Sequence, residues 1–137
     1  MNDKCFIDTN IIVYCYSVSE PEKQSISRKL IVDNITYVST QVLQELTNIV
    51  VKKLQYSYET AKKAILETCS NNNLHTNTFA TITTACNIAA QYKFSFYDSL
   101  IISAALETNS RILYSEDLRH GQIIENRLTI INPFITE

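Results

Sequence analysis

Residues 4–16 read KCFIDTNIIVYCY, and this stretch decides the fold class. The short apolar run that ends at Asp8 is typical of a buried strand, and Thr9 or Asn10 can cap a helix that continues through Tyr16. A strand followed directly by a helix is the first half of a βα unit. We therefore expect a sheet whose strands alternate with helices.

The rest of the chain continues this alternation. Strands are expected at 4–8, 37–39, 111–114 and 129–131, with a weak one near 75, and helices at 9–16, 21–34, 40–53, 57–69, 79–92 and 97–107. Ser95 can cap the last helix, which is apolar on nearly all sides and should be deeply packed. The pattern predicts an α/β fold, a three-layer α/β/α sandwich with a mainly parallel central sheet.

Length and composition favour a single folded domain. The 137 residues fit one compact domain, residues 1–137, and 45% of them are hydrophobic, which is enough to form a core. No apolar run reaches the ~18 residues that a membrane span needs, and the start lacks a leader pattern. We expect a cytoplasmic protein with no membrane contact. The four cysteines lack paired spacing and are expected to be buried reduced thiols.

The charge balance limits the ways in which the chain can bind nucleic acid. Twelve basic and fourteen acidic residues give a net charge of −2, which argues against a broadly basic surface. Contact with nucleic acid must therefore be local. Paired lysines on helices usually form a solvated face, so Arg119, which lies close to Asp117 in the chain, is the best single candidate for a phosphate contact.

Four acidic residues are predicted to meet at one edge of the sheet. Asp8 ends the first strand, and Asp117 lies just beyond the strand at 111–114. Glu45 is early in the helix after the second strand, and Asp98 opens a helix that leads into the 111–114 strand. In a parallel sheet, the carboxyl ends of strands and the beginnings of helices gather at the same edge, where ligands bind.

A cluster of this kind needs a cation. Two carboxylates about 4 Å apart repel each other by roughly 4 kcal/mol at the effective dielectric of a protein surface. Oxygen ligands without His or Cys suit a hard ion such as Mg²⁺ or Mn²⁺, which also binds substrate phosphates. The chemistry that follows is phosphodiester hydrolysis, in which the ion polarises the phosphoryl group and activates water.

These residues are also where the chain resembles a known family. The segments FIDTN at 6–10, QVLQEL at 41–46, FYDSL at 96–100 and YSEDL at 114–118 resemble those of PIN-domain ribonucleases, and specifically VapC-like toxins of toxin–antitoxin pairs. Each segment alone is a weak signal, but their order and spacing are fairly specific. The resemblance covers essentially the whole chain.

The resemblance carries its own expectations. It implies that Asp8, Glu45, Asp98 and Asp117 are catalytic and metal-binding residues, and that Asn10 and Ser115 are polar supporting residues, with Glu116 as a further supplement to Asp117. It also implies a Mg²⁺- or Mn²⁺-dependent endoribonuclease that leaves a 5′-phosphate. Frequent homodimers and a cognate antitoxin that covers the site are implied as well. The modest basic content is the main departure.

Each residue also has a structural interpretation. Asp8 and Asp117 are common turn residues, Glu45 is a good helix former, and Asp98 is spaced from Ser95 as in a capping box. Four such roles falling on one edge by coincidence is the less favoured interpretation.

Three other functions remain open. A phosphatase with Asp8 as nucleophile usually needs a second Asp two residues later, where this chain has Asn10. A metal-independent ribonuclease could use His120 and leave a cyclic phosphate. A catalytically silent module that binds RNA or a protein partner is the third alternative.

Overall fold

The first strand and helix of the chain lie at the centre of the fold. In this computed structural model, which describes residues 3–135, β1 (Lys4–Ile7) pairs in parallel with β2 (Ile35–Ser39) on one side and β4 (Ile112–Tyr114) on the other. Beyond them lie β3 (Asn73–His75), β6 (Leu128–Ile131) and β5 (Ile123–Ile124), in the order β3-β2-β1-β4-β6-β5. All pairs are parallel except β5 with β6, so the predicted sheet is confirmed.

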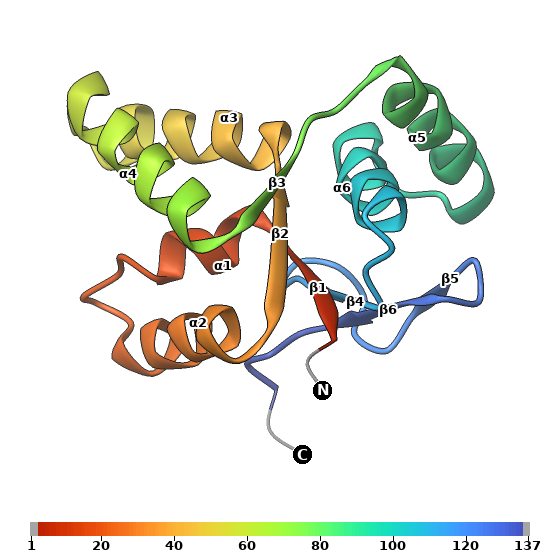
Figure 1. The fold of residues 1–137 in the computed structure, drawn as a ribbon, viewed down its shortest axis with the longest axis horizontal. Coiled ribbons are helices and arrows are strands. Elements are labelled where there is room, and N and C mark those ends of the chain that lie inside the picture. Colours follow the sequence, from red (N-terminus) through yellow and green to blue (C-terminus); the bar gives the residue numbers. More distant parts are fainter. Residues whose placement is uncertain (1–2, 136–137) are drawn as a thin grey trace.

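The helices form two groups beside the sheet. They are α1 (Thr9–Tyr14), α2 (Pro21–Asp33), α3 (Thr40–Asn48), α4 (Tyr58–Asn71), α5 (Phe79–Tyr92) and α6 (Phe96–Glu107). Figure 1 shows α1 to α4 to the left of β1 and β2, with α5 and α6 as a pair to the right. After α3 the chain continues as a π-helical segment, Ile49–Lys53, so the predicted helix of 40–53 has two parts.

The core explains why both groups are needed. In β1 the consecutive residues Cys5, Phe6 and Ile7 are all fully buried, which requires cover on both faces of the sheet. In α6 every residue from Ser99 to Leu106 is buried, as its apolar sequence predicts. The two groups of helices therefore supply the two outer layers of the sandwich.

Two local features differ from what the sequence predicts. The residue that caps α1 is Asp8, whose side chain accepts from the backbone N–H of Thr9, rather than Thr9 or Asn10. Strand β5 was not predicted, because its turn to β6 uses Glu125 and Asn126 with φ of 51° and 57° instead of a glycine-containing pair. Gly121, at φ 87°, lies just before this hairpin.

The cysteine prediction is only partly right. All four thiols are free, but Cys5 is the buried one, while Cys15 and Cys69 are half-buried and Cys86 is exposed on α5. Burial raises the pKa of the Cys5 and Cys15 thiols to about 11, so both remain protonated at neutral pH. Across residues 3–135, no helix combines the length and apolar character of a membrane span.

Candidate functional site

An open cleft of about 450 Å³ lies at the carboxyl edge of the sheet. It is lined by all four predicted acids, Asp8, Glu45, Asp98 and Asp117, and also by Thr9, Asn10, Gln41, Gln44, Asn48, Ile49, Tyr97 and Ile101. The lining comes from the end of β1, from α1, from α3 with the π-helical segment, from the first turns of α6, and from the loop after β4. Distant segments are thus brought to one cavity.

Asp8 follows β1 and lines the cleft as a half-buried residue. One carboxylate oxygen accepts from the backbone N–H of Thr9 at 2.7 Å, and the other accepts from the Ser115 hydroxyl at 2.9 Å. Burial nevertheless raises the pKa of Asp8 from 3.8 to about 6, and the negative charges of Glu45 and Asp98 add to the rise. The two hydrogen bonds lower the pKa without cancelling the effect of burial.

Glu45 is held through both of its carboxylate oxygens. The Thr9 hydroxyl donates to Oε1 in a short hydrogen bond, and the Gln41 amide donates to Oε2 at 3.2 Å. Thr9 therefore connects two of the acids, because its backbone N–H binds Asp8 and its side chain binds Glu45. The first turn of α1 acts as a common support for both carboxylates.

Asp98 is placed by the beginning of α6. The Ser95 hydroxyl accepts from the backbone N–H of Asp98 at 3.2 Å, which confirms the predicted cap and leaves the Asp98 carboxylate outside that contact. An acid in the first turn of a helix is also favoured by the helix dipole. Capping of α6 and a role for this carboxylate in the cleft are compatible.

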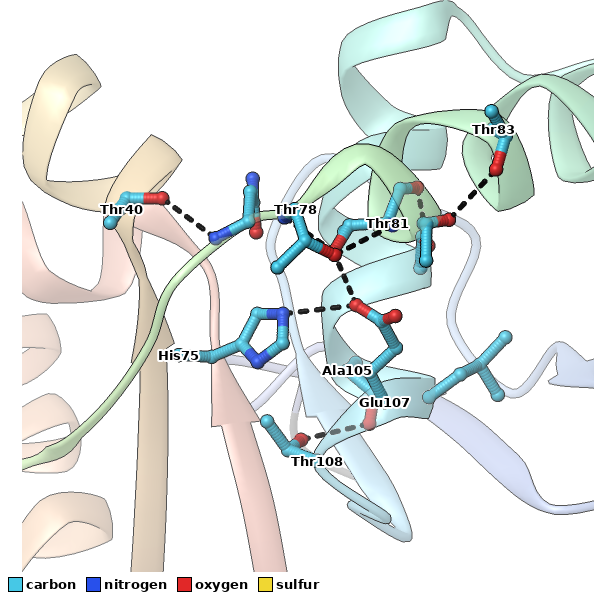
Figure 2. A network of polar contacts seen from close by, with 12 residues as sticks. Thr40, His75, Thr78, Thr81, Thr83, Ala105, Glu107 and Thr108 are labelled. Carbon is cyan, nitrogen blue, oxygen red and sulfur yellow. Dashed lines mark hydrogen bonds and ion pairs between the residues drawn. The ribbon is translucent and has the colours of Figure 1, made fainter.

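Contacts at the far end of α6 fix this helix to the rest of the fold. The Glu107 carboxylate contacts His75 of β3 at 3.0 Å and accepts from the hydroxyl of Thr81 in α5, as Figure 2 shows. In the same network, the Thr40 hydroxyl at the beginning of α3 accepts from the backbone N–H of Asn77 at 3.1 Å. The helix that carries Asp98 is thereby joined to β3 and α5, and the Thr40 contact joins α3 to the segment between them.

Asp117 is supported from α1. The Asn10 side-chain amide donates to the Asp117 carboxylate at 2.7 Å, and the two residues are 107 positions apart in the chain. Ser115, two residues earlier, donates to Asp8 and also accepts from the backbone N–H of Leu118 at 3.3 Å. Asn10 and Ser115 thus each contact one of the four acids of the cleft.

Glu116 and Arg119 lie elsewhere. The Glu116 carboxylate forms an ion pair with Lys23 of α2 and accepts from the Tyr14 hydroxyl at 2.6 Å, and the residue is not among those that line the cleft. The Lys23 and Tyr14 contacts lower the pKa of Glu116. Arg119 is exposed in the loop after β4 and is also outside the lining. The structure brings neither side chain into the cleft.

The charges within the cleft are not balanced. None of the ion pairs among residues 3–135 involves Asp8, Glu45, Asp98 or Asp117. In the same part of the chain, no three His, Cys, Asp or Glu side chains are already arranged as a metal site. The cleft therefore gathers oxygen ligands around one space without preassembling them into a coordination shell.

Sequence reasoning missed several residues of the cleft. Thr9 and Gln41 contact Glu45 directly, and Tyr97 offers its backbone carbonyl to Gln41 at 3.1 Å. The available signal was spacing, because Gln41 lies one helical turn before Glu45. Spacing does not show which polar side chains point inward.

The sequence was compared with models of known protein families. The PIN domain family matches residues 5–125, which include every element that lines the cleft. The chain belongs to the PIN-domain family. Members of this family are nucleases, and no curated protein matches this PIN domain.

Solved structures share this PIN-domain fold. The Mycobacterium tuberculosis toxin VapC20, described as cleaving the sarcin-ricin loop, has a TM-score of 0.68 at 14% identity, covering 82% of this chain and 89% of its own. A DNA-bound VapBC from Salmonella typhimurium has a TM-score of 0.65 at 18% identity, covering 95% and 98%. VapBC2 from Rickettsia felis, bound to a promoter fragment, has 0.63 at 18%, covering 83% and 88%. The TM-scores show a shared fold, and at identities of 14–18% the likeness is one of fold alone.

Proposed function

We propose that this PIN domain is a metal-dependent endoribonuclease that hydrolyses RNA phosphodiester bonds. The observation that carries the proposal is the cleft itself, in which four carboxylates from distant segments share one space and none is paired with a cation among the described residues. A divalent ion would relieve the repulsion that this arrangement creates.

The donor chemistry of the cleft suits Mg²⁺ or Mn²⁺. The acids offer only oxygen, neither histidine lines the cleft, and the raised pKa of Asp8 records the cost of negative charge there. Asp8, Glu45, Asp98 and Asp117 would hold the ion. When bound, a divalent cation supplies positive charge that polarises a phosphoryl group and stabilises the leaving oxygen.

The side chains of the cleft have distinct proposed roles. Asp8 and Glu45 are each held by two hydrogen bonds, so they are prepared to offer oxygen lone pairs in fixed positions. Asn10 holds Asp117, and Ser115 holds Asp8. Arg119, exposed on the loop that carries Asp117, is proposed to contact a substrate phosphate at the rim.

We also propose that the chain is the toxin of a toxin–antitoxin pair. This is supported by the PIN-domain family and by the similarity of its fold to VapC20 and to two VapBC complexes. The proposal includes a cognate antitoxin that covers the cleft, a homodimer, and action on RNA in the cytoplasm. The antitoxin would prevent cleavage until it is removed.

Incubation of the purified chain with total RNA tests the activity. We expect cleavage with Mg²⁺ or Mn²⁺, none with EDTA, and products whose downstream fragments begin with a 5′-phosphate. The ends can be mapped by ligation that requires a 5′-phosphate. Cleavage that continues in EDTA and leaves a cyclic phosphate would contradict the proposal and favour a metal-independent reaction with His120.

The same experiment separates the second candidate function. A catalytically silent module would bind RNA or a protein partner without cleaving any RNA under any metal condition. The complete acid set around the cleft favours the enzyme, because carboxylates that share one space repel each other and no ion pair among the described residues offsets that repulsion. Binding without cleavage across all RNA fractions would favour the silent module.

A further inference from the structure

Gln41 is a buried polar residue in the wall of the cleft. It lies in the first turn of α3, one helical turn before Glu45, and its exposed fraction is 3%. Glutamine is usually exposed, and a buried one normally has its hydrogen bonds satisfied. The contacts of this side chain therefore show what it does in the fold.

Both contacts of Gln41 use its amide nitrogen. Nε2 donates to Oε2 of Glu45 at 3.2 Å and to the backbone carbonyl of Tyr97 at 3.1 Å. A carbonyl and an ionised carboxylate can only accept hydrogen bonds, so the orientation of the Gln41 amide is determined. Reversing the amide would place its oxygen against two other oxygens.

The other half of the amide is unsatisfied. Oε1 of Gln41 is buried and has no hydrogen-bond partner among residues 3–135. A buried amide oxygen without a partner is unfavourable, and a hydrophobic residue of similar size would avoid it. The fold keeps this cost while it uses both donors of the same group at the cleft, which points to a functional reason.

The two contacts connect the acids of different segments. Thr9 donates to Oε1 of Glu45, so Gln41 supplies the hydrogen bond to the remaining oxygen and the carboxylate is held from both sides. Tyr97 directly precedes Asp98, so the same amide joins α3 to the first turn of α6. One side chain thus controls where two of the acids lie relative to each other.

We infer that Gln41 is a positioning residue that holds the Glu45 carboxylate beside Asp98 so that both bind one divalent cation. This inference rests on the proposed function. Residues that orient metal ligands typically contribute about 10–100-fold to metal affinity or activity. Gln41 acts through Glu45 and does not itself need to touch the ion or the RNA.

Mn²⁺ binding to the purified chain tests the inference, with free Mn²⁺ measured by electron paramagnetic resonance. Gln41→Met keeps the length of the side chain and removes both donors, so we expect Kd for Mn²⁺ to rise about tenfold. Gln24→Met is the matched control, because Gln24 is half-buried in α2, donates to the Cys15 carbonyl at 3.4 Å, and lies outside the cleft. Its Kd should equal that of the wild type.

Cleavage kinetics add a readout that general damage to the fold would not give. At limiting Mn²⁺, Gln41→Met should lower kcat with little change in KM for RNA, and saturating Mn²⁺ should restore most of kcat because Glu45 is still present. Circular dichroism checks folding of each variant. If Gln41→Met does not fold, Gln41→Asn replaces it, since the shorter amide cannot reach both acceptors and should weaken binding in the same direction.

The outcomes separate the two levels of the argument. No Mn²⁺ binding by the wild type would overturn the proposed function. Normal binding by the wild type with equal affinity in the folded Gln41 variant would overturn only the role of Gln41. Equal weakening in Gln41→Met and Gln24→Met would also overturn it, because the effect would then not depend on contact with Glu45.

Discussion

Glu116 and Asp117 are neighbours in the chain, yet their carboxylates have opposite surroundings. Glu116 faces α1 and α2, where Lys23 and Tyr14 bind it and lower its pKa. Asp117 faces the cleft, where Asn10 donates to it and the other acids add negative charge. The protein itself supplies a cation to Glu116, whereas no ion pair among residues 3–135 involves a carboxylate of the cleft.

Helix α1 serves both carboxylates. Asn10 and Tyr14 are four residues apart, so they lie on the same face of the helix, and they contact Asp117 and Glu116 respectively. The Lys23 ammonium also lies 4.8 Å from the centroid of the Tyr14 ring. The Glu116 cluster therefore anchors the loop on which Asp117 reaches the cleft.

The largest expected effect is on the cleft side. Asp98→Asn should reduce RNA cleavage by about 10³-fold, a loss typical of groups that stabilise the transition state directly. Metal-free stability should be equal or higher, because the change relieves repulsion and the Ser95 cap uses only the backbone N–H of Asp98. Cleavage assays and urea unfolding check both parts. A large loss of metal-free stability would show that Asp98 is chiefly structural.

The second effect is a dependence of stability on pH that comes from Asp8. Its pKa is about 6 in the folded chain against the ordinary 3.8, so the folded state binds the proton more tightly than the unfolded state. The stability that protonated Asp8 contributes is fully present below a pH of about 4. It is lost as the pH rises through about 6, which lowers the free energy of unfolding by at most roughly 3 kcal/mol.

Urea unfolding of the metal-free protein between pH 4 and 8 measures this effect. The same series with Mn²⁺ should show a smaller decline, since the cation favours the ionised carboxylate. Identical pH profiles for wild type and Asp8→Asn would contradict the assignment of the effect to Asp8.

A smaller effect is expected on the anchored side. Glu116→Gln should lower the free energy of unfolding by about 1 kcal/mol, because the ion pair with Lys23 is partly exposed to solvent. Cleavage should fall only a few-fold, as a result of looser placement of Asp117. Asp117→Asn should be measured in the same assays. We expect this variant to lose cleavage and to keep its stability, the opposite of Glu116→Gln. The reverse pattern would assign the two carboxylates the opposite roles.

The smallest effect concerns Arg119. Arg119→Ala should raise KM for RNA by about threefold. Because one phosphate contact is lost, the slope of log KM against log salt concentration should fall by roughly one. Stability should not change, because Arg119 is exposed. Cleavage measured across a series of salt concentrations decides this, and an unchanged salt dependence would remove Arg119 from the substrate contacts.

Much of the fold could be predicted from local patterns. The KCFIDTN segment predicted β1 and α1, and the apolar sequence of α6 predicted its burial, since both depend on short-range spacing. Strand β5 was missed because it has two residues and its turn lacks glycine. The sequence did not identify the exact residue at the end of an element: it favoured Thr9 or Asn10 as the cap of α1, where the structure has Asp8.

Part of the candidate site could also be predicted from the sequence, and part could not. The four acids could be placed because the ends of parallel strands and the beginnings of the following helices share an edge whatever the details of packing. The direction in which Glu116 points could not be predicted from the sequence. Adjacent residues in a loop can point to different sides, and only the complete fold brings Lys23 near Glu116. Gln41 and Thr9 were missed for the same reason, because their roles depend on which rotamers meet Glu45.

Diffraction from crystals soaked in Mn²⁺ tests the central claim most directly, because the anomalous signal of manganese locates the ion itself. We predict a peak in the cleft within about 2–2.3 Å of carboxylate oxygens from at least two of Asp8, Glu45, Asp98 and Asp117. A well-ordered crystal with millimolar Mn²⁺ and no peak among these four side chains would contradict the account.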